Sequence, residues 1–211
     1  LALCLLEARQ ASAAKIEVDK FLLHVADAPE ALILKARILR RLGKEEEAST
    51  FERRAKQLGF TRDSLDFILK TNYWGGGLRN QQFGQLLAKE PSCPLLYFLR
   101  AKAELGEYEY DKALADLRQC SSHNRGDQGL AGMVFLYTAD AHLACGKSSQ
   151  AIDASTHAIE LFEKQFKKAD WLPFCLQEAP DTVRRRAYEL RAIAYSGLQK
   201  YDQAIADMKH I

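Results

Sequence analysis

The chain has 211 residues, of which 47% are hydrophobic and 27% are charged, a composition that allows a substantial core and argues against disorder. Its 30 Lys and Arg against 28 Asp and Glu give a formal net charge of +2, so we expect no nucleic-acid partner. The 5 cysteines are an odd number spread through helical sequence. They indicate reduced thiols and a cytoplasmic location, with the nucleus as the alternative.

The two ends of the sequence predict neither a leader nor an anchor. The opening LALCLLEARQ is apolar, but it lacks the basic start and the cleavage site of a signal peptide. No stretch is long and apolar enough to cross a membrane, so no membrane insertion is expected. The first residue is not Met, and the chain stops at Ile211 within a predicted helix. These features indicate a fragment of a longer protein.

Hydrophobic periodicity with few glycines and prolines predicts helices throughout the chain. About six helix pairs are expected, within a single domain that spans residues 1–211. In chain order they are a degenerate pair at 1–28, a repeat at 29–60, a degenerate repeat at 61–93, a repeat at 94–127, a repeat at 128–168 followed by an insertion at 169–180, and a truncated repeat at 181–211.

Internal repetition is the most specific signal in this sequence. The segment YFLRAKAELGEYEYDKALADL from Tyr97 matches YELRAIAYSGLQKYDQAIADM from Tyr188 at its aromatic, Arg-Ala, Gly and Ala-Asp positions. Segments that begin at Leu32 and Phe135 have the same skeleton. Each repeat places one alanine in the first helix and one in the second, where small side chains let two helices approach. These alanine pairs are Ala36 with Ala48, Ala101 with Ala113, Ala139 with Ala151, and Ala192 with Ala204.

This skeleton resembles the tetratricopeptide repeat, a helix-turn-helix unit of about 34 residues. The resemblance implies an all-α fold, an α-solenoid of antiparallel helix pairs that form a right-handed superhelix. Turn glycines occur at two offsets, because Gly43 and Gly146 lie beside the break between helices, whereas Gly106 and Gly197 come slightly earlier. We expect these glycines to supply the left-handed conformation that ends a helix.

The resemblance also implies that the first helices line a concave groove. Helical geometry then selects the residues that face a ligand. The predicted peptide-binding groove contains Arg37, Arg40, Arg41, Phe98, Leu99, Lys102, Leu136, Tyr137, Asp140, Arg186, Glu189 and Ile193. Its first part is basic and the rest is largely apolar, which suits an amphipathic helix with an acidic end. The alternative is that several of these residues are buried between repeats.

One branch of the resembled family clamps the carboxylate terminus of heat-shock chaperones with lysines, an asparagine and an arginine. At the place of the asparagine this chain has Leu34, Leu99, Tyr137 and Leu190, and only Arg186 is a basic residue in register. A carboxylate would meet apolar surface there and lose its hydration. A chaperone tail is therefore not expected as the ligand.

Catalytic and metal sites are not expected either. Cys120 and His123 lie at the end of one predicted second helix, and His142 and Cys145 lie a turn apart on the following first helix. Four such ligands could in principle converge, and zinc binds them. The spacing is far less specific than a double CxxC pattern, however, and Cys120 occupies a small core position, so core packing is the favoured interpretation. Cys175 has no neighbouring acid or base in the sequence. We therefore expect no catalytic residue, no metal and no cofactor.

These observations favour a non-catalytic scaffold or adaptor that binds a peptide or amphipathic helix of another protein. A structural subunit of a larger multiprotein assembly is the first alternative, and exposed apolar surface would favour it. A co-chaperone, or a substrate-recruiting module of a larger enzyme, is the second. Neither the partner nor the oligomeric state follows from the sequence.

Overall fold

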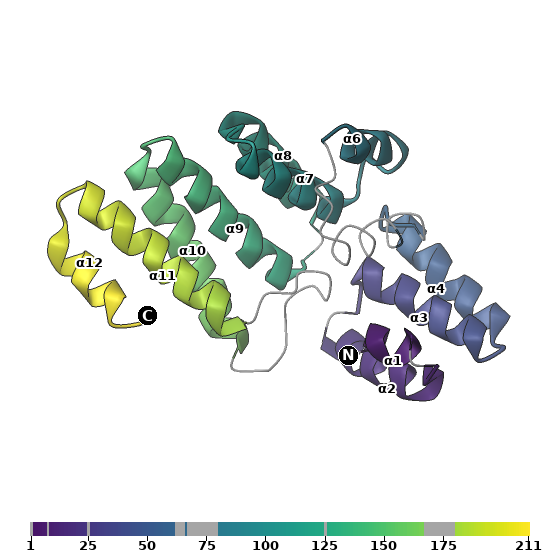
Figure 1. Ribbon diagram of the computed structural model, residues 1–211. Helices are drawn as coiled ribbons and strands as arrows, with labels where there is room; N and C mark the ends of the chain where they lie inside the picture. Colours follow the sequence, from purple (N-terminus) through teal and green to yellow (C-terminus); the bar gives the residue numbers. More distant parts are fainter. Residues whose placement is uncertain are drawn as a thin grey trace. The chain divides into compact units, whose positions relative to one another are not determined.

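The computed structural model describes the chain except at residues 1, 8, 25, 62–65, 67–79, 125 and 167–179. Within the described residues, all regular secondary structure is helical (Figure 1). The all-α prediction is thus confirmed. The glycine run at 75–77 and nearly all of the insertion predicted at 169–180 lie outside the described residues, as does most of the first helix expected in the degenerate repeat at 61–93.

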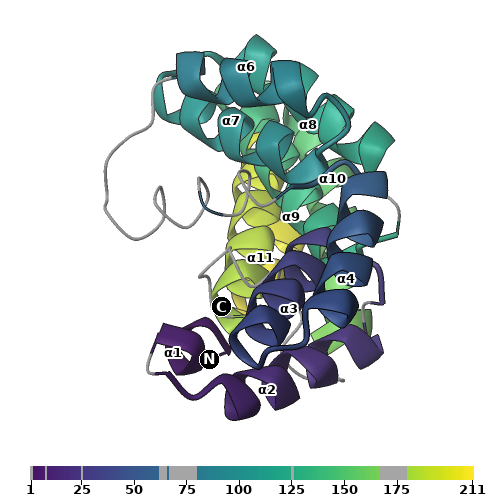
Figure 2. The same cartoon turned by 90° about the vertical axis from the view of Figure 1, so that its right-hand side faces the viewer.

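Packing divides the chain into two compact units, Leu1–Gly77 with Gly84–Cys93, and Leu78–Phe83 with Pro94–Ile211. The first unit contains α1 (Ala2–Glu7), α2 (Ala11–His24), α3 (Pro29–Arg41) and α4 (Glu45–Gln57), while α6 (Asn80–Lys89) is divided between the units at Gly84. Within the first unit, α1 packs on α2, α2 on α3 and α3 on α4 (Figure 2). The sequence-based boundaries of the helix pairs at 1–28 and 29–60 enclose these helices.

The second unit holds the remaining helix pairs. They are α7 (Pro94–Gly106) with α8 (Tyr110–His123), α9 (Gln128–Ala144) with α10 (Ser148–Phe166), and α11 (Pro180–Gly197) with α12 (Tyr201–Met208). Each helix packs against the next one along the chain, and α9 also contacts α7 and α11 (Figure 1). The first helices of successive pairs therefore lie side by side, in the order α7, α9, α11.

The alanine pairs lie where first and second helices meet. All eight side chains are buried, and most of them are fully buried; they are Ala36 with Ala48, Ala101 with Ala113, Ala139 with Ala151, and Ala192 with Ala204. Small side chains at such positions let two helix backbones approach closely. Ala36 and Ala48 belong to one buried cluster, and the burial of the other three pairs agrees with the contact predicted from the repeat.

The turns between paired helices share one geometry. The residue with a left-handed backbone is Gly43 (φ 76°), Tyr108 (φ 62°), Gly146 (φ 71°) or Gln199 (φ 59°), which are the same position of the repeat. The amide that follows each of them donates to a carbonyl five residues earlier, over 2.8–2.9 Å. This is the hydrogen bond of a Schellman motif, and it satisfies a carbonyl at the helix end.

The expected role of two turn glycines is wrong. Gly106 and Gly197 are the last residues of α7 and α11, and neither has a positive φ. The Schellman hydrogen bond fixes the left-handed position two residues further on, where these repeats carry Tyr and Gln instead of Gly. The glycine in these two repeats therefore ends the helix without making the left-handed turn.

Candidate partner-binding surface

Three first helices bring charged side chains together around Tyr137 of α9. The Lys102 Nζ, from α7, lies 5.1 Å from the centroid of the Tyr137 ring, and the Arg186 Cζ, from α11, also lies 5.1 Å from it. Cations at this distance are attracted to the face of an aromatic ring. Tyr137 itself is buried and contacts the ring of Phe98 edge-on, with the centroids 5.3 Å apart.

An ion pair links two of the same helices. Arg186 donates a hydrogen bond to the carboxylate of Asp140, one turn after Tyr137 on α9, and both side chains are more than a third exposed. Ile193, two turns after Arg186 on α11, is 58% exposed, and Glu189 between them is partly exposed. We call the set Lys102, Asp140, Arg186, Glu189 and Ile193, which lies around the buried Tyr137, the first-helix wall. It combines both signs of charge with exposed apolar surface.

Four apolar residues of the predicted groove are in the core instead. Phe98 and Leu136 are fully buried, and Leu99 is 7% exposed, so, with Tyr137, they offer little surface to a ligand. The physical reason is that successive first helices pack directly on one another, and this packing buries the apolar side chains between them. The expectation that Phe98 and Leu136 anchor a partner is therefore corrected, and the alternative of burial between repeats holds for them.

The basic part of the predicted groove has partners within the first unit. Arg37 lies 2.9 Å from a carboxylate oxygen of Asp66, and the Arg41 guanidinium donates to the Leu6 carbonyl oxygen over 3.1 Å. Arg40 makes a bidentate pair with Glu52 and a 2.8 Å hydrogen bond with Glu45. Hydrogen bonds to these carboxylates, led by that of Glu52, raise the Arg40 pKa above its usual value. These arginines therefore stabilise the fold around α3 and do not form an unpaired basic wall.

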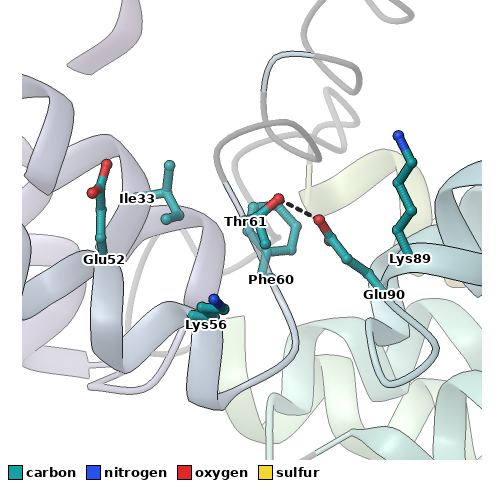
Figure 3. Close-up of a pocket in the computed structure, with 7 residues that line it drawn as sticks. All are labelled: Ile33, Glu52, Lys56, Phe60, Thr61, Lys89 and Glu90. Atoms are coloured by element: carbon teal, nitrogen blue, oxygen red, sulfur yellow. Dashed lines mark hydrogen bonds between the residues drawn. The ribbon is translucent and has the colours of Figure 1, made fainter.

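A pocket lies in the first unit (Figure 3). This pocket of about 470 Å³ is lined by side chains from α3, α4, the loop after α4 and the end of α6, namely Ile33, Glu52, Lys56, Phe60, Thr61, Lys89 and Glu90. Thr61 donates a hydrogen bond to the Glu90 carboxylate across it. Sequence reasoning missed this pocket because it lies beside the degenerate repeat at 61–93, where the repeat pattern gives no register.

The four soft ligands considered for zinc are in ordinary structural environments. Cys120 is a buried cysteine, and the His123 ring stacks on Tyr97 with centroids 5.6 Å apart. His142 has a buried Nδ1 without a hydrogen-bond partner in the described part of the chain, and burial, reinforced by nearby cationic side chains, lowers its pKa. Among the described residues, no group of three or more His, Cys, Asp or Glu side chains is placed to hold a metal ion.

The described helices do not include one long and apolar enough to cross a membrane. No protein-family model matches the chain, and no curated protein matches it significantly in sequence.

Among solved structures, the chain is similar to "Crystal structure of MamA", with 13% identity, a TM-score of 0.48, and coverage of 100% of this chain and 91% of that chain. A second match, "Crystal structure of MamA protein", has 13% identity, a TM-score of 0.48, and coverage of 99% and 85%. The tetratricopeptide resemblance remains a prediction that rests on the internal repeat of this chain.

Proposed function

We propose that this chain is a non-catalytic scaffold that binds a peptide or amphipathic helix of a partner protein on the first-helix wall. The observation that carries the proposal is the convergence of Lys102, Tyr137 and Arg186 from three separate helices. A surface built from successive helices presents an extended row of contacts, which suits a linear ligand.

The chemistry of the wall indicates which ligand suits it. Lys102 and Arg186 both place positive charge near the Tyr137 ring, and Arg186 stays partly exposed in its pair with Asp140, so an acidic side chain of the ligand would be favoured there. Ile193 offers exposed apolar area further along α11, which suits an aliphatic or aromatic side chain. The arginines of α3 are not part of this proposal, because α3 belongs to the first unit and the first-helix wall to the second.

The test is a quantitative pull-down from cell lysate with the full chain and with a variant that carries Lys102→Glu and Ile193→Glu. Neither side chain belongs to the core, so the helical fold should persist, and circular dichroism checks this. The matched control carries Arg118→Glu and Gln203→Glu on second helices, where both side chains are exposed. This control changes the net charge as much as the wall variant does, but at positions outside the first-helix wall.

Partners that bind the wild-type chain and the control, and that are lost from the wall variant, support the proposal. Cross-linking then locates the bound segment against α7, α9 and α11. Partners that bind all three proteins equally overturn the proposal, because they show that ligands do not use the wall.

The second candidate function is a structural subunit of a larger assembly. It is favoured by exposed large apolar side chains on α12, where Tyr201, Ile205 and Met208 are each more than half exposed. Contiguous exposed apolar area marks interaction sites in soluble proteins. A partner retained by the wall variant but lost when α12 is altered would favour this function over the first.

A further inference from the structure

Three residues of the second unit occupy the same position of three successive first helices. Lys102 of α7, Asp140 of α9 and Ile193 of α11 each lie six residues before the left-handed residue of the turn that follows the helix. We call these three residues the wall row. Because α9 contacts both α7 and α11 (Figure 1), the row crosses three neighbouring helices, with one residue on each.

The wall row stays accessible where a further first helix packs alongside. The side chain of Asp140 is 36% exposed although α11 packs on α9. Lys102 is partly exposed although α9 packs on α7. Ile193, at the same position of α11, is 58% exposed. The accessibility of this position is thus a property of the repeat, and it does not depend on which segment follows a helix pair.

The chemistry of the wall row changes from one helix to the next. Lys102 carries a positive charge, Asp140 carries a negative charge, and Ile193 offers aliphatic surface. Arg186 donates to Oδ2 of Asp140, and a carboxylate can accept further hydrogen bonds on its other oxygen. A ligand that crosses the row in this order would be complementary to it with an acidic, a basic and an aliphatic side chain.

The distance between neighbouring helices selects the conformation of such a ligand. Packed helices lie about 8–10 Å apart. A polyproline II helix has three residues per turn and advances about 9 Å per turn, so every third side chain would meet the next first helix. The side chains on one face of a β-strand are only about 7 Å apart, and an α-helix returns to the same face after seven residues, or about 10.5 Å. The polyproline II conformation therefore fits the row best.

A second row of side chains lies beside the wall row. Residues three apart lie on one face of a helix, and three residues after the members of the wall row the chain carries Leu105, Leu143 and Ser196, none of which is buried. The two leucines offer apolar surface to the residues that separate the three recognised side chains of the ligand. Proline rings suit this surface, and they also hold a ligand in the polyproline II conformation before it binds.

We propose that the first-helix wall binds a polyproline II segment of a partner protein in which an acidic, a basic and an aliphatic residue follow one another at intervals of three. The acidic residue would pair with Lys102, the basic residue with Asp140, and the aliphatic residue would pack on Ile193. This proposal rests on the proposed function, since it uses the same surface, and it adds the conformation and the sequence pattern of the ligand.

The probe for the test is a fluorescein-labelled peptide in which Glu, Arg and Leu are separated by two prolines each, with prolines at both ends. Its fluorescence anisotropy is followed as the full chain is added. We expect saturable binding, about tenfold tighter than that of a peptide in which Glu and Arg are exchanged. The exchanged peptide has the same composition and conformation, so it isolates the order of the charges. Both peptides are also made in the reverse direction, because the wall row does not fix the direction in which the ligand runs.

A charge reversal in the chain links the peptide to the wall row. Lys102→Glu should weaken binding of the first peptide about tenfold, and it should strengthen binding of a peptide with Arg in place of Glu by about the same factor. The matched control is Arg118→Glu, at an exposed position of α8. It makes the same change in net charge, and it should bind both peptides like the wild-type chain. Circular dichroism checks that both variants stay helical.

Either of two results would overturn the proposal. One is a wild-type chain that, in both directions, binds the first peptide no more tightly than the exchanged peptide. The other is equally tight binding of a peptide with three prolines between the same residues, which would mean that the interval of three is not recognised. In both cases the proposed function still stands if the variant with Lys102→Glu and Ile193→Glu loses partners in the pull-down. If that variant retains every partner, the proposed function fails as well.

Discussion

Arg191 of α11 donates hydrogen bonds of 2.8 and 2.7 Å, from Nε and Nη2, to the two carboxylate oxygens of Asp207 in α12. Arg100 binds both carboxylate oxygens of Asp116 in the same way between α7 and α8. The acidic partner is buried in both pairs. A bidentate pair of this kind constrains how one helix is rotated against the other, in addition to its distance.

We predict that Asp207→Ala destabilises the chain strongly. The substitution leaves the Arg191 guanidinium, whose side chain is 17% exposed, without its carboxylate. An uncompensated charge in such a position costs about 3 kcal/mol of the free energy of unfolding. Urea unfolding followed by far-UV circular dichroism measures the loss.

The matched control for this prediction removes both charges, with Arg191→Met and Asp207→Leu. Apolar replacement of a buried ion pair is often neutral, so the double variant should lie within about 1 kcal/mol of the wild-type chain. A double variant as unstable as Asp207→Ala would mean that the loss came from packing and not from an unpaired charge.

The second prediction concerns the left-handed turns. Gly146→Ala should lower the free energy of unfolding by about 1 kcal/mol, because a side chain rarely adopts a positive φ. No atom lies within 4 Å of a Cβ built at Gly146, so the cost is conformational and not steric. Gln199→Gly, at the same position of the last turn, should instead raise stability by up to about 1 kcal/mol. Thermal melts of both variants measure these changes. A melting temperature that shifts in the same direction in both variants would contradict the prediction.

A third prediction compares two helical glycines. In α9, a Cβ at Gly132 would lie 2.5 Å from Cε1 of the buried Phe162 ring, so Gly132→Ala forces the ring or the helix to move and should cost about 1–2 kcal/mol. In α6, a Cβ built at Gly84 would meet open space. Gly84→Ala should therefore stabilise the chain by about 0.5–1 kcal/mol through helix propensity alone. Equal effects of the two substitutions on urea unfolding would contradict the proposed contact.

The helix pairs could be predicted from the sequence because their determinants are local. The alanine at each contact and the proline that starts α3, α7 and α11 lie within a few turns of the structure they specify. The left-handed conformation is predicted correctly where this position is glycine, at Gly43 and Gly146, and wrongly at Gly106 and Gly197. At Tyr108 and Gln199 the residue type does not reveal the left-handed backbone, because the hydrogen bonds at the helix end impose that conformation whichever residue is present.

The candidate site could be predicted only in part because exposure depends on long-range packing. Lys102 and Arg186 both approach the Tyr137 ring, and Arg186 pairs with Asp140. Phe98 and Leu136, which were predicted in the same groove, are buried instead. The exposure of a residue on one helix thus depends on the position of a second helix many residues away. The partners of the arginines on α3 are similarly distant in sequence, and no local pattern predicts them.

The last prediction is a pH dependence that arises from Glu104 of α7. The residue is 5% exposed, and its Oε2 has no hydrogen-bond partner among the described residues. Burial, followed by the negative charge of Asp116, raises the Glu104 pKa from 4.5 to about 7, although Arg100 acts in the opposite direction. Between these two pH values the folded chain holds a proton that the unfolded chain has lost. The free energy of unfolding therefore falls as the pH rises from about 4.5 to about 7, and the penalty remains in full above that interval.

Glu104→Gln removes this titration and keeps the size of the side chain. We expect the variant to gain stability relative to the wild-type chain by roughly 1–3 kcal/mol more at about pH 8 than at about pH 5. Comparing the two proteins at each pH cancels the titration of all other groups that they share. Glu107→Gln is the control, because Glu107 lies on the same turn but is exposed, and it should show no such difference. If Glu104→Gln changes stability equally at both pH values, Glu104 is ionised in the folded chain throughout, and Arg100 must neutralise it together with Asp116.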